Sequence, residues 1–528
     1  MLSRKRKIGI GIAVCLVLLS SMILMYVERK TASASEIKQN LVVGEMWPIR
    51  TVDPVRSGTL VKEKAMIVET LVEANPDFTL KPGLAESWEQ INDTQWKFYL
   101  RKGVKFHDGT EFTADAVKWS IENALNKSPP LKALTLIKSI EVLDKHTLLF
   151  TTENPYAAFP ASLVHSSLGI VSPTSEIDDK GNIIKPIGTG PFKLERFDIA
   201  TGTLYLIRND DYWSGKPRLE RIIIKAIPDP ASRAISVEKG EVDFTCDVPY
   251  GEIERLKRLG LKVELHATAR VYQLTFGNLS DTPYSDVRVR KAISYAIDRE
   301  AISERTLHGS AEPAVGPIMP TLWWANRNLT EYSYNPERAK ELLAEAGWRD
   351  VDGDGILEKD GEEFSVTLYT YPERPALQPM AEAIQAMLKD VGIKVEVRVM
   401  EYSAIEKHMT DRDMKLASYS VAMVPDPDYY FRKMFHSKGD YNKWGYSNSE
   451  MDSLLEHGLM TFDADKRKEV YDRVQEIALD EVPVIYVAYY KVPVVMHDYV
   501  KGFVFNPVAH DYMLNLEIYI EGQKTRWR

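Results

Sequence analysis

Hydrophobic and polar positions along the chain change repeatedly between the two-residue period of strands and the 3.6-residue period of helices. Residues 96–100 alternate like a half-buried strand. Residues 114–125 then place four apolar side chains on one helical face, which are Ala116, Val117, Ile121 and Ala124. Residues 286–306 carry a second apolar stripe, with Ser285 or Asp286 able to cap the helix. The pattern predicts strands mixed with helices throughout, without an internal repeat.

The clearest local unit lies in the second half of the chain. Residues 366–399 read as strand, helix and strand, because apolar positions alternate at both ends and follow a helical period between them. Upstream, Asn335-Pro336 opens another helix and Gly347 closes it. Units of this βαβ kind predict α/β lobes whose sheets are covered by helices, with ligands bound in crevices at strand ends.

The N-terminus carries one apolar run that is long enough to cross a membrane. Four basic residues at 4–7 precede an uncharged run at 8–27. This arrangement marks either a membrane anchor or a secretory signal, with the following residues outside the cytoplasm. The run length favours an anchor, whereas Ala32-Ser33-Ala34 offers a cleavage site. Lipid modification of Cys15 is a further alternative, which the apolar residues around it make less favourable than a plain membrane-embedded cysteine.

The charge and cysteine content narrow the functional classes. Lys and Arg number 67 and Asp and Glu number 76 among 528 residues, a net charge of −9. An acidic chain lacks the broad basic surface that a phosphate backbone requires, so we expect no nucleic-acid partner. Cys246 is the only cysteine beyond the apolar run, which excludes internal disulfides and a multi-thiolate metal site. We expect it to be buried and structural.

Signatures of common catalytic sites are missing from the sequence. It contains no serine elbow, no dinucleotide or Walker glycine pattern, and no two histidines four residues apart. We therefore expect no enzyme and no cofactor. The glycine-rich stretch 188–192 reads as a turn rather than a phosphate cradle, because Pro191 removes a backbone donor. Residues 350–355 begin like a calcium loop, but Gly361 occupies the position of the bidentate glutamate, so a polar turn that needs no ion is the alternative.

Binding residues are sought among aromatic side chains and isolated charges. Trp47, Trp323 and Trp324 lie in loops near prolines, where they would stack on a ligand or pack between domains. Arg374 lies between Pro372 and Pro375, after a strand and before a helix. A guanidinium held there would bind a carboxylate with two hydrogen bonds, or form a surface ion pair.

Two consecutive segments carry a family resemblance. Residues 96–109, Trp-Lys-Phe-Tyr-Leu-Arg-Lys-Gly-Val-Lys-Phe-His-Asp-Gly, are followed by Phe-Thr-Ala-Asp-Ala-Val at 112–117. Together they closely resemble the signature of family 5 solute-binding proteins, the peptide, opine and nickel receptors of ABC importers. Supporting stretches are 186–192, 208–213, 227–243, 286–299 and 334–348, and the resemblance covers roughly residues 40–520.

The resemblance implies an α/β, two-lobed periplasmic-binding-protein-like fold of type II with an additional domain. The segments it implies are a signal peptide or anchor at 1–35, a discontinuous lobe I at 36–78, 190–280 and 490–528, an additional domain II at 79–189, and lobe III at 281–489. Family members close around their ligand by hinge motion and present the closed form to a membrane permease.

The resemblance also points to ligand residues. Arg374 matches the position at which dipeptide-binding relatives hold the terminal carboxylate, whereas their amine-binding aspartate is replaced here by Met423. Asp426 or Asp428 is the candidate substitute, although Asp-Pro-Asp also serves as a turn. Tyr429 is added to the candidate ligand residues. Trp47-Pro48 is similar to nickel-binding relatives, but their chelate-contacting aromatics align with Val421 and Pro425. His436, a few positions from their histidine, is a weak metal candidate.

These observations give one functional prediction. We expect an exported, monomeric substrate-binding protein that captures short peptides in the periplasm or on the outer face of the cell membrane. Its partners would be the ligand and an ABC permease with its ATPase. Binding of a nickel chelate or opine-type metallophore is the first alternative, and an extracellular hydrolase is the second.

Overall fold

The structure is a computed structural model that describes residues 38–330 and 332–522. The expectations for the N-terminal run, its cleavage pattern and Cys15 lie outside the described residues. Within residues 38–330 and 332–522, no helix combines the length and the apolar character needed to span a membrane.

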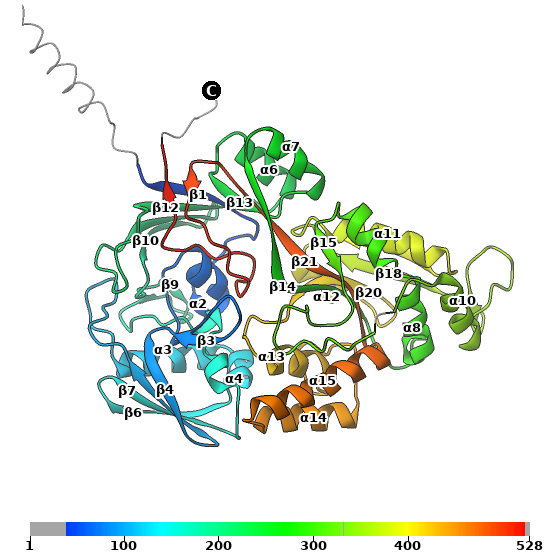
Figure 1. Cartoon of the computed structure of the whole chain (residues 1–528), viewed down its shortest axis with the longest axis horizontal. Helices are drawn as coiled ribbons and strands as arrows, with labels where there is room; N and C mark the ends of the chain where they lie inside the picture. Colours follow the sequence, from blue (N-terminus) through cyan, green and yellow to red (C-terminus); the bar gives the residue numbers. More distant parts are fainter. Residues whose placement is uncertain (1–37, 331, 523–528) are drawn as a thin grey trace, which may run out of the picture.

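One mixed sheet of eleven strands runs through the molecule (Figure 1). Its order is β10-β11-β12-β1-β13-β21-β14-β20-β18-β19, and β15 pairs with β21. The strands are β10 (Phe192–Asp198), β11 (Thr203–Arg208), β12 (Arg221–Ala226), β1 (Asn40–Glu45), β13 (Phe244–Cys246), β21 (Val484–Met496), β14 (Lys262–Phe276), β20 (Met414–Ser420), β18 (Ser365–Thr370), β19 (Lys394–Val399) and β15 (Ala311–Pro313). We call the β10–β13 side lobe I and the β20–β19 side lobe III.

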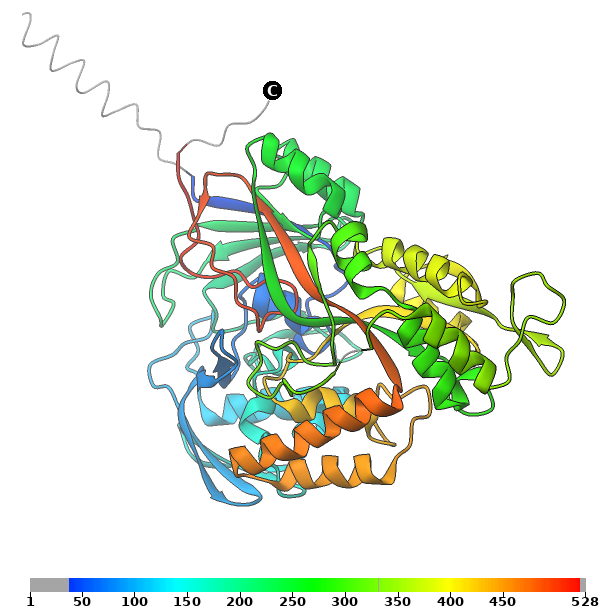
Figure 2. The same cartoon turned by 45° about the vertical axis from the view of Figure 1, so that its right-hand side comes forward.

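The long strands β14 and β21 connect the two lobes. Their antiparallel register runs from Lys262 opposite Met496 to Ala267 opposite Lys491, and resumes with Val271 opposite Tyr489. Residues 268–270 therefore lie opposite the single residue Tyr490. Such a bulge bends the strand and strengthens its twist. It places Arg270 and Tyr490 where the two lobes meet, as Figures 1 and 2 show for the diagonal pair of strands.

The predicted βαβ unit is confirmed. Strands β18 and β19 pair in parallel, and α11 (Leu377–Lys389) connects them. The predicted helix at 114–125 is α3 (Ala114–Lys127), capped by Thr113. The helix expected after Asn335 is α10 (Pro336–Glu345), and Gly347 follows with a positive φ of 93°.

The helix predicted at 286–306 was too long. Asp286 caps α8 (Val287–Ala296), but Ile297 adopts an extended backbone and Asp298 caps a new helical segment. That segment comprises α9 (Arg299–Ala301) and η5 (Ile302–Thr306). The apolar stripe continues through the break because both segments pack on the same core, and periodicity alone does not reveal the interruption.

A second, four-stranded sheet holds the 96–100 strand. Its order is β4-β5-β7-β6, with β4 (Ala85–Asn92), β5 (Gln95–Leu100), β7 (Thr147–Thr152) and β6 (Ile137–Asp144). Phe98 packs edge-on against Phe150 at 5.2 Å between ring centroids. The backbone at Gly188 packs directly against lobe I. A side chain would not fit there, because a Cβ would lie 1.9 Å from the Ile67 carbonyl oxygen. In place of the turn predicted at 188–192, the chain bends at 189–191 and enters β10 at Phe192, and close backbone approach explains Gly188.

Three helices below the central strands close the molecule, namely α13 (Pro427–Phe435), α14 (Ser449–Met460) and α15 (Ala464–Glu481) (Figure 2). They contact the small sheet's region, because Ala157 donates a backbone hydrogen bond to Leu459 at 2.9 Å. The remaining elements are α2 (Pro54–Gly58), η1 (Thr59–Lys64), β2 (Val72–Ala74), β3 (Leu80–Pro82), α4 (Pro129–Thr135), α5 (Phe159–Ser162), η2 (Ser166–Leu168), β8 (Glu176–Ile177), β9 (Ile183–Lys185), α6 (Pro230–Glu238), η3 (Tyr250–Glu252), α7 (Ile253–Arg258), η4 (Pro283–Ser285), β16 (Glu358–Lys359), β17 (Glu362–Glu363), α12 (Tyr402–His408), β22 (Val500–Lys501) and β23 (Tyr519–Ile520).

Candidate functional site

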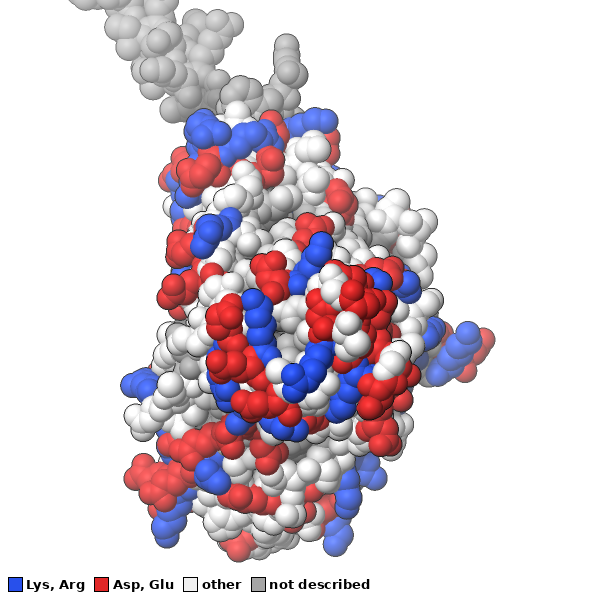
Figure 3. Space-filling view, turned by 90° about the vertical axis from the view of Figure 1, so that its right-hand side faces the viewer, with Lys and Arg blue, Asp and Glu red and all other residues white. Residues whose placement is uncertain are grey.

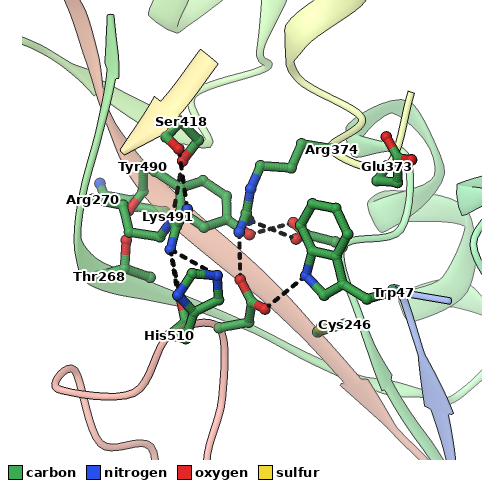
Figure 4. A network of polar contacts seen from close by, with 12 residues as sticks. Trp47, Cys246, Thr268, Arg270, Glu373, Arg374, Ser418, Tyr490, Lys491 and His510 are labelled. Atoms are coloured by element: carbon green, nitrogen blue, oxygen red, sulfur yellow. Dashed lines mark hydrogen bonds and ion pairs between the residues drawn. The ribbon is translucent and has the colours of Figure 1, made fainter. Parts of the chain in front are cut away.

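Arg374 lies at the junction of the lobes with no exposed surface. It belongs to the lobe III segment between β18 and α11, but both of its ion-pair partners come from lobe I and the C-terminal segment. Its Nη1 lies 3.2 Å from Asp247 Oδ2, and its Nη2 lies 2.5 Å from Asp511 Oδ1. Tyr490 donates its hydroxyl to Asp247. The alternative of a surface ion pair is therefore wrong, since this pair is buried and connects the lobes (Figure 4).

Trp47 joins the same cluster directly after β1. Its indole N–H donates to Asp511 Oδ2 at 3.2 Å, and the Arg374 guanidinium lies 5.8 Å from the ring centroid. Its ring also lies 6.4 Å from that of Tyr371. The structure thus brings together two residues that the sequence proposed separately, and Figure 4 shows them converging on one carboxylate.

Arg270 and His510 were missed by the sequence analysis. Arg270 Nε donates to Ser418 Oγ at 3.0 Å, and its Nη1 lies 3.1 Å from His510 Nδ1 (Figure 4). Burial, together with the positive charge of Arg270, holds the pKa of His510 well below its usual range, so the imidazole is neutral at pH 7. Only tertiary folding joins a strand bulge to a C-terminal loop, and no local motif marks either residue.

A buried π-helix fixes the loop that carries His510 and Asp511. Within η1, Lys64 Nζ lies 2.8 Å from Glu45 Oε1 and 3.3 Å from Asp511 Oδ2. Glu63 accepts the backbone N–H of His510 at 2.9 Å. Burial opposes ionisation of Asp511, but the positive charges of Arg374, Lys64 and Arg270 hold its pKa well below the usual range. Two successive side chains of η1 therefore set the position and the charge of the loop, as π-helical turns at functional sites often do.

Glu63 gives this loop a measurable pH response. Burial raises the pKa of Glu63 to about 7 from 4.5, so the folded protein holds this proton more tightly than the unfolded chain. The resulting stability is complete below about pH 4.5 and is lost as the pH rises through about 7. In urea unfolding, we expect Glu63→Gln to match the wild type at low pH and to exceed it by about 3 kcal/mol at pH 8.

The matched control for this prediction is Glu122→Gln on the exposed face of α3. We expect it to leave the pH dependence of stability unchanged. An equal difference between Glu63→Gln and the wild type at both pH values would show that the Glu63 proton does not contribute.

Asp426 and Asp428 are engaged in ion pairs within lobe III. Asp426 caps α13, and its two oxygens lie 2.5 and 2.6 Å from the Arg467 guanidinium. Asp428 accepts from Arg432 and from the Tyr471 hydroxyl, each at 2.9 Å. Both carboxylates therefore tie α13 to the neighbouring helices in this structure, and an amine would have to compete with these arginines.

The remaining candidate ligand residues are Tyr429, Trp324, Trp323 and His436, and they do not join the Arg374 cluster in Figure 4. Tyr429 is buried, with its ring 4.7 Å from Lys433 Nζ and its hydroxyl 3.5 Å from Met423 Sδ. Trp324 is fully buried and packs edge-on against Phe78 at 6.0 Å, which is the packing between segments that the sequence offered as an alternative.

Trp323, next to Trp324, is 41% exposed. His436 Nδ1 accepts the Lys438 amide at 3.0 Å, and its Nε2 lies 3.6 Å from Glu456 Oε1. Cys246 is fully buried in β13, as expected, and burial raises the pKa of its thiol well above the usual range.

The acidic loop after α10 forms a compact turn. Asp350 accepts the amides of Gly353 and Gly355, and Asp352 accepts that of Asp354. Oxygens of Asp350, Asp352, Asp354 and Glu358 lie within 4.8 Å of one another, and the three aspartates are exposed. These hydrogen bonds are those of a polar turn that needs no ion, and the ion-binding alternative stays open.

The face of the molecule in Figure 3 carries both acidic and basic side chains, without a continuous basic surface in that view.

Comparison with known proteins assigns the family. The family model described as "Bacterial extracellular solute-binding proteins, family 5 Middle" matches residues 79–442. The chain is 29% identical over 462 residues to the oligopeptide-binding protein AppA of Bacillus subtilis, covering 84% of each chain. It is 30% identical over 483 residues to the dipeptide-binding protein of Escherichia coli, covering 83% of this chain and 86% of that protein.

Solved structures agree with the sequence relatives. AppA of B. subtilis in complex with a nonapeptide has a TM-score of 0.78 at 27% identity, covering 92% of this chain and 100% of that chain. NikA of Staphylococcus aureus in complex with Ni(L-His)2 has a TM-score of 0.80 at 26% identity, with the same coverage. The expected two-lobed α/β fold is confirmed by these neighbours. The chain belongs to the family 5 bacterial extracellular solute-binding proteins.

Proposed function

We propose that this protein is the substrate-binding subunit of an ABC importer and captures short peptides between its two lobes. Arg374 is the observation that carries the proposal. Its guanidinium lies buried between the lobes, and its Nε is without a hydrogen-bond partner among the described residues. A buried, unsatisfied donor on a charged group is costly, and a ligand carboxylate would satisfy it.

Ligand binding and lobe closure would act through the same side chain. Arg374 contacts Asp247 and Asp511, which belong to the other side of the junction. A peptide carboxylate could accept hydrogen bonds from Nε and from one Nη. It would then take the place of the aspartate that this Nη now contacts. Because the guanidinium would keep its second aspartate, the ligand would stabilise the closed arrangement over the open one.

The named relatives support peptides as the ligand class. AppA is an oligopeptide-binding protein whose structure holds a nonapeptide, and the E. coli relative is a dipeptide-binding protein. The amine of the peptide has no assigned partner, because Asp426 and Asp428 are paired with arginines. We therefore assign the carboxylate end to Arg374 and Trp47, and leave the amine end without a dedicated anchor.

A chelate of a divalent metal, such as nickel bound by an amino-acid or opine-type ligand, is the second candidate. The observation that favours it is His510, whose imidazole is neutral beside Arg270. Neutral imidazole is the state that coordinates metals, and a chelate also carries carboxylates for Arg374. NikA of S. aureus, a structural neighbour, was solved with Ni(L-His)2.

The proposal includes the setting of the protein. The chain acts outside the cytoplasm as a monomer, held or exported by residues 1–35, and delivers its ligand to a permease with an associated ATPase. Lobe I is formed by 36–78, 190–280 and 490–528, domain II by 79–189, and lobe III by 281–489. The protein binds its ligand without turnover, and no cofactor takes part. Two features support this division. Strands β4 to β7 of domain II form a sheet of their own, and β14 and β21 connect the strands of lobe I with those of lobe III in the large sheet.

The ligand class is tested by native mass spectrometry of the full chain purified from its own host. We expect bound species whose fragmentation gives short peptide sequences. A nickel ion released together with a small chelator would establish the second candidate instead. If the purified protein hydrolyses added peptides, and the Arg374 variants hydrolyse them as well, the binding function is contradicted and the extracellular hydrolase is favoured.

A further inference from the structure

A cavity of about 280 Å³ opens on the lobe III side of the junction. Its floor is formed by β20 and the end of β14, one wall by α12, and the other wall by the loop at 440–444. Three tyrosines line it, which are Tyr402, Tyr419 and Tyr441. Tyr402 and Tyr441 are among the exposed large side chains of the protein, so the cavity has an aromatic and accessible mouth.

A row of packed aromatic rings lies between the cavity and the Arg374 cluster. Tyr371 follows β18, with its ring 6.4 Å from Trp47 and 5.0 Å from Tyr402. Trp47 in turn contacts the Asp511 carboxylate that pairs with Arg374. A ligand whose carboxylate lies at Arg374 would therefore extend along Trp47 and Tyr371 towards this cavity.

Lys415 is the charged group on the cavity floor. It is 8% exposed, and its ammonium donates no hydrogen bond to the residues that the structure describes at 38–330 and 332–522. The one carboxylate oxygen within 4 Å is Oε1 of Glu406, at 3.9 Å, which exceeds hydrogen-bond length. The Lys415 side chain is therefore mostly buried, but its ammonium has only this long ion pair to an exposed carboxylate and can donate hydrogen bonds to a ligand in the cavity.

The other charges around the cavity lie at its rim. Glu406, Asp411, Asp440 and Lys443 are all exposed. Charges in full contact with water are screened, whereas a charge on a mostly buried side chain inside a cavity is screened less. The exposed acidic side chains at the rim therefore weaken, but do not cancel, the attraction of Lys415 for a ligand carboxylate.

We propose that this cavity is a specificity subsite that binds an acidic side chain of the peptide, with Lys415 as its partner. The inference rests on the proposed function and deepens it, because it assigns the ligand class as peptides containing aspartate or glutamate. The tyrosine rings would pack on the methylene groups of that side chain, and the Lys415 ammonium would donate to its carboxylate.

The test is calorimetric binding of alanine tripeptides in which one position at a time carries Glu or its neutral isostere Gln. We expect at least one Glu peptide to bind the full chain about tenfold more tightly than its Gln counterpart, the range of a charge-assisted hydrogen bond. Lys415→Met should abolish this difference and leave affinity for the Gln peptides within about twofold. Lys415→Arg should retain it.

Lys407→Met is the matched control, because Lys407 is an exposed lysine on α12 that does not line the cavity. It should keep the full preference for Glu peptides. Equal affinity of the wild type for Glu and Gln peptides would overturn the subsite and leave the proposed function standing. The subsite would also be overturned, and the proposed function would stand, if Lys415→Met weakened binding of the Glu peptides and the Gln peptides equally. If no peptide of the panel binds, the subsite and the peptide function both fail.

Discussion

Replacing Arg374 by alanine is expected to remove ligand binding and to destabilise the protein by about 3–5 kcal/mol, because breaking a buried ion pair leaves uncompensated charge. Asp247 and Asp511 are both fully buried and would lose their shared guanidinium. The ligand carboxylate would lose its bidentate donor at the same time. Calorimetry with the co-purified ligand and urea unfolding measure the two effects separately.

Arg374→Lys separates the binding role from the structural one. Lysine keeps a positive charge near the two aspartates but lacks the planar fork. We expect a smaller loss of stability together with a loss of affinity of about tenfold or more. Arg398→Ala is the matched control, because Arg398 is an exposed arginine of lobe III that pairs with Glu396. Unchanged ligand affinity in Arg374→Ala would show that the carboxylate assignment is wrong.

Replacing Lys64 by methionine is expected to have the second large effect. The ammonium of Lys64 is buried between Glu45 and Asp511, at 2.8 and 3.3 Å. Methionine fills a similar volume but leaves two carboxylates without this partner, at a cost of about 3–5 kcal/mol in the free energy of unfolding. The loop carrying His510 and Asp511 would lose its clamp, so ligand affinity should fall although Lys64 makes no proposed ligand contact.

Urea unfolding at pH 7 measures the stability change, and calorimetry measures the affinity. Lys257→Met is the control, because Lys257 forms an exposed ion pair with Glu254 on α7. Exposed pairs contribute about 0–1 kcal/mol, so this control should lie close to the wild type. A loss of stability in Lys64→Met no greater than in Lys257→Met would contradict the clamp.

Local sequence patterns predicted the elements that depend on neighbouring residues. The βαβ unit at 366–399 was predicted correctly because its strand and helix periods and its turns are all local. The caps at Asp286 and Asn335 follow the same logic, since each side chain accepts a backbone amide two or three residues ahead. The break at 297–298 was missed because the apolar stripe continues across it, and packing on a shared core overrides periodicity.

The candidate site was predictable only in part. Arg374 and Trp47 were found because prolines and strand ends mark loops that present side chains to a crevice. Their partners Asp247 and Asp511 lie 127 and 137 residues away from Arg374, and nothing in the local sequence distinguishes them from surface aspartates. Asp426 and Asp428 looked like free acids in a turn, and only the fold placed Arg467 and Arg432 against them.

The sequence by itself therefore determined the α/β class, the family and the position of one arginine between two prolines, since these depend on patterns within a few turns of chain. The tertiary structure decided which charges meet. The bulge in β14 brings Arg270 to His510, and the π-helix holds Asp511 between Lys64 and Arg374. The reason is physical, because buried ion pairs depend on distances of about 3 Å between segments that only the packed core brings together.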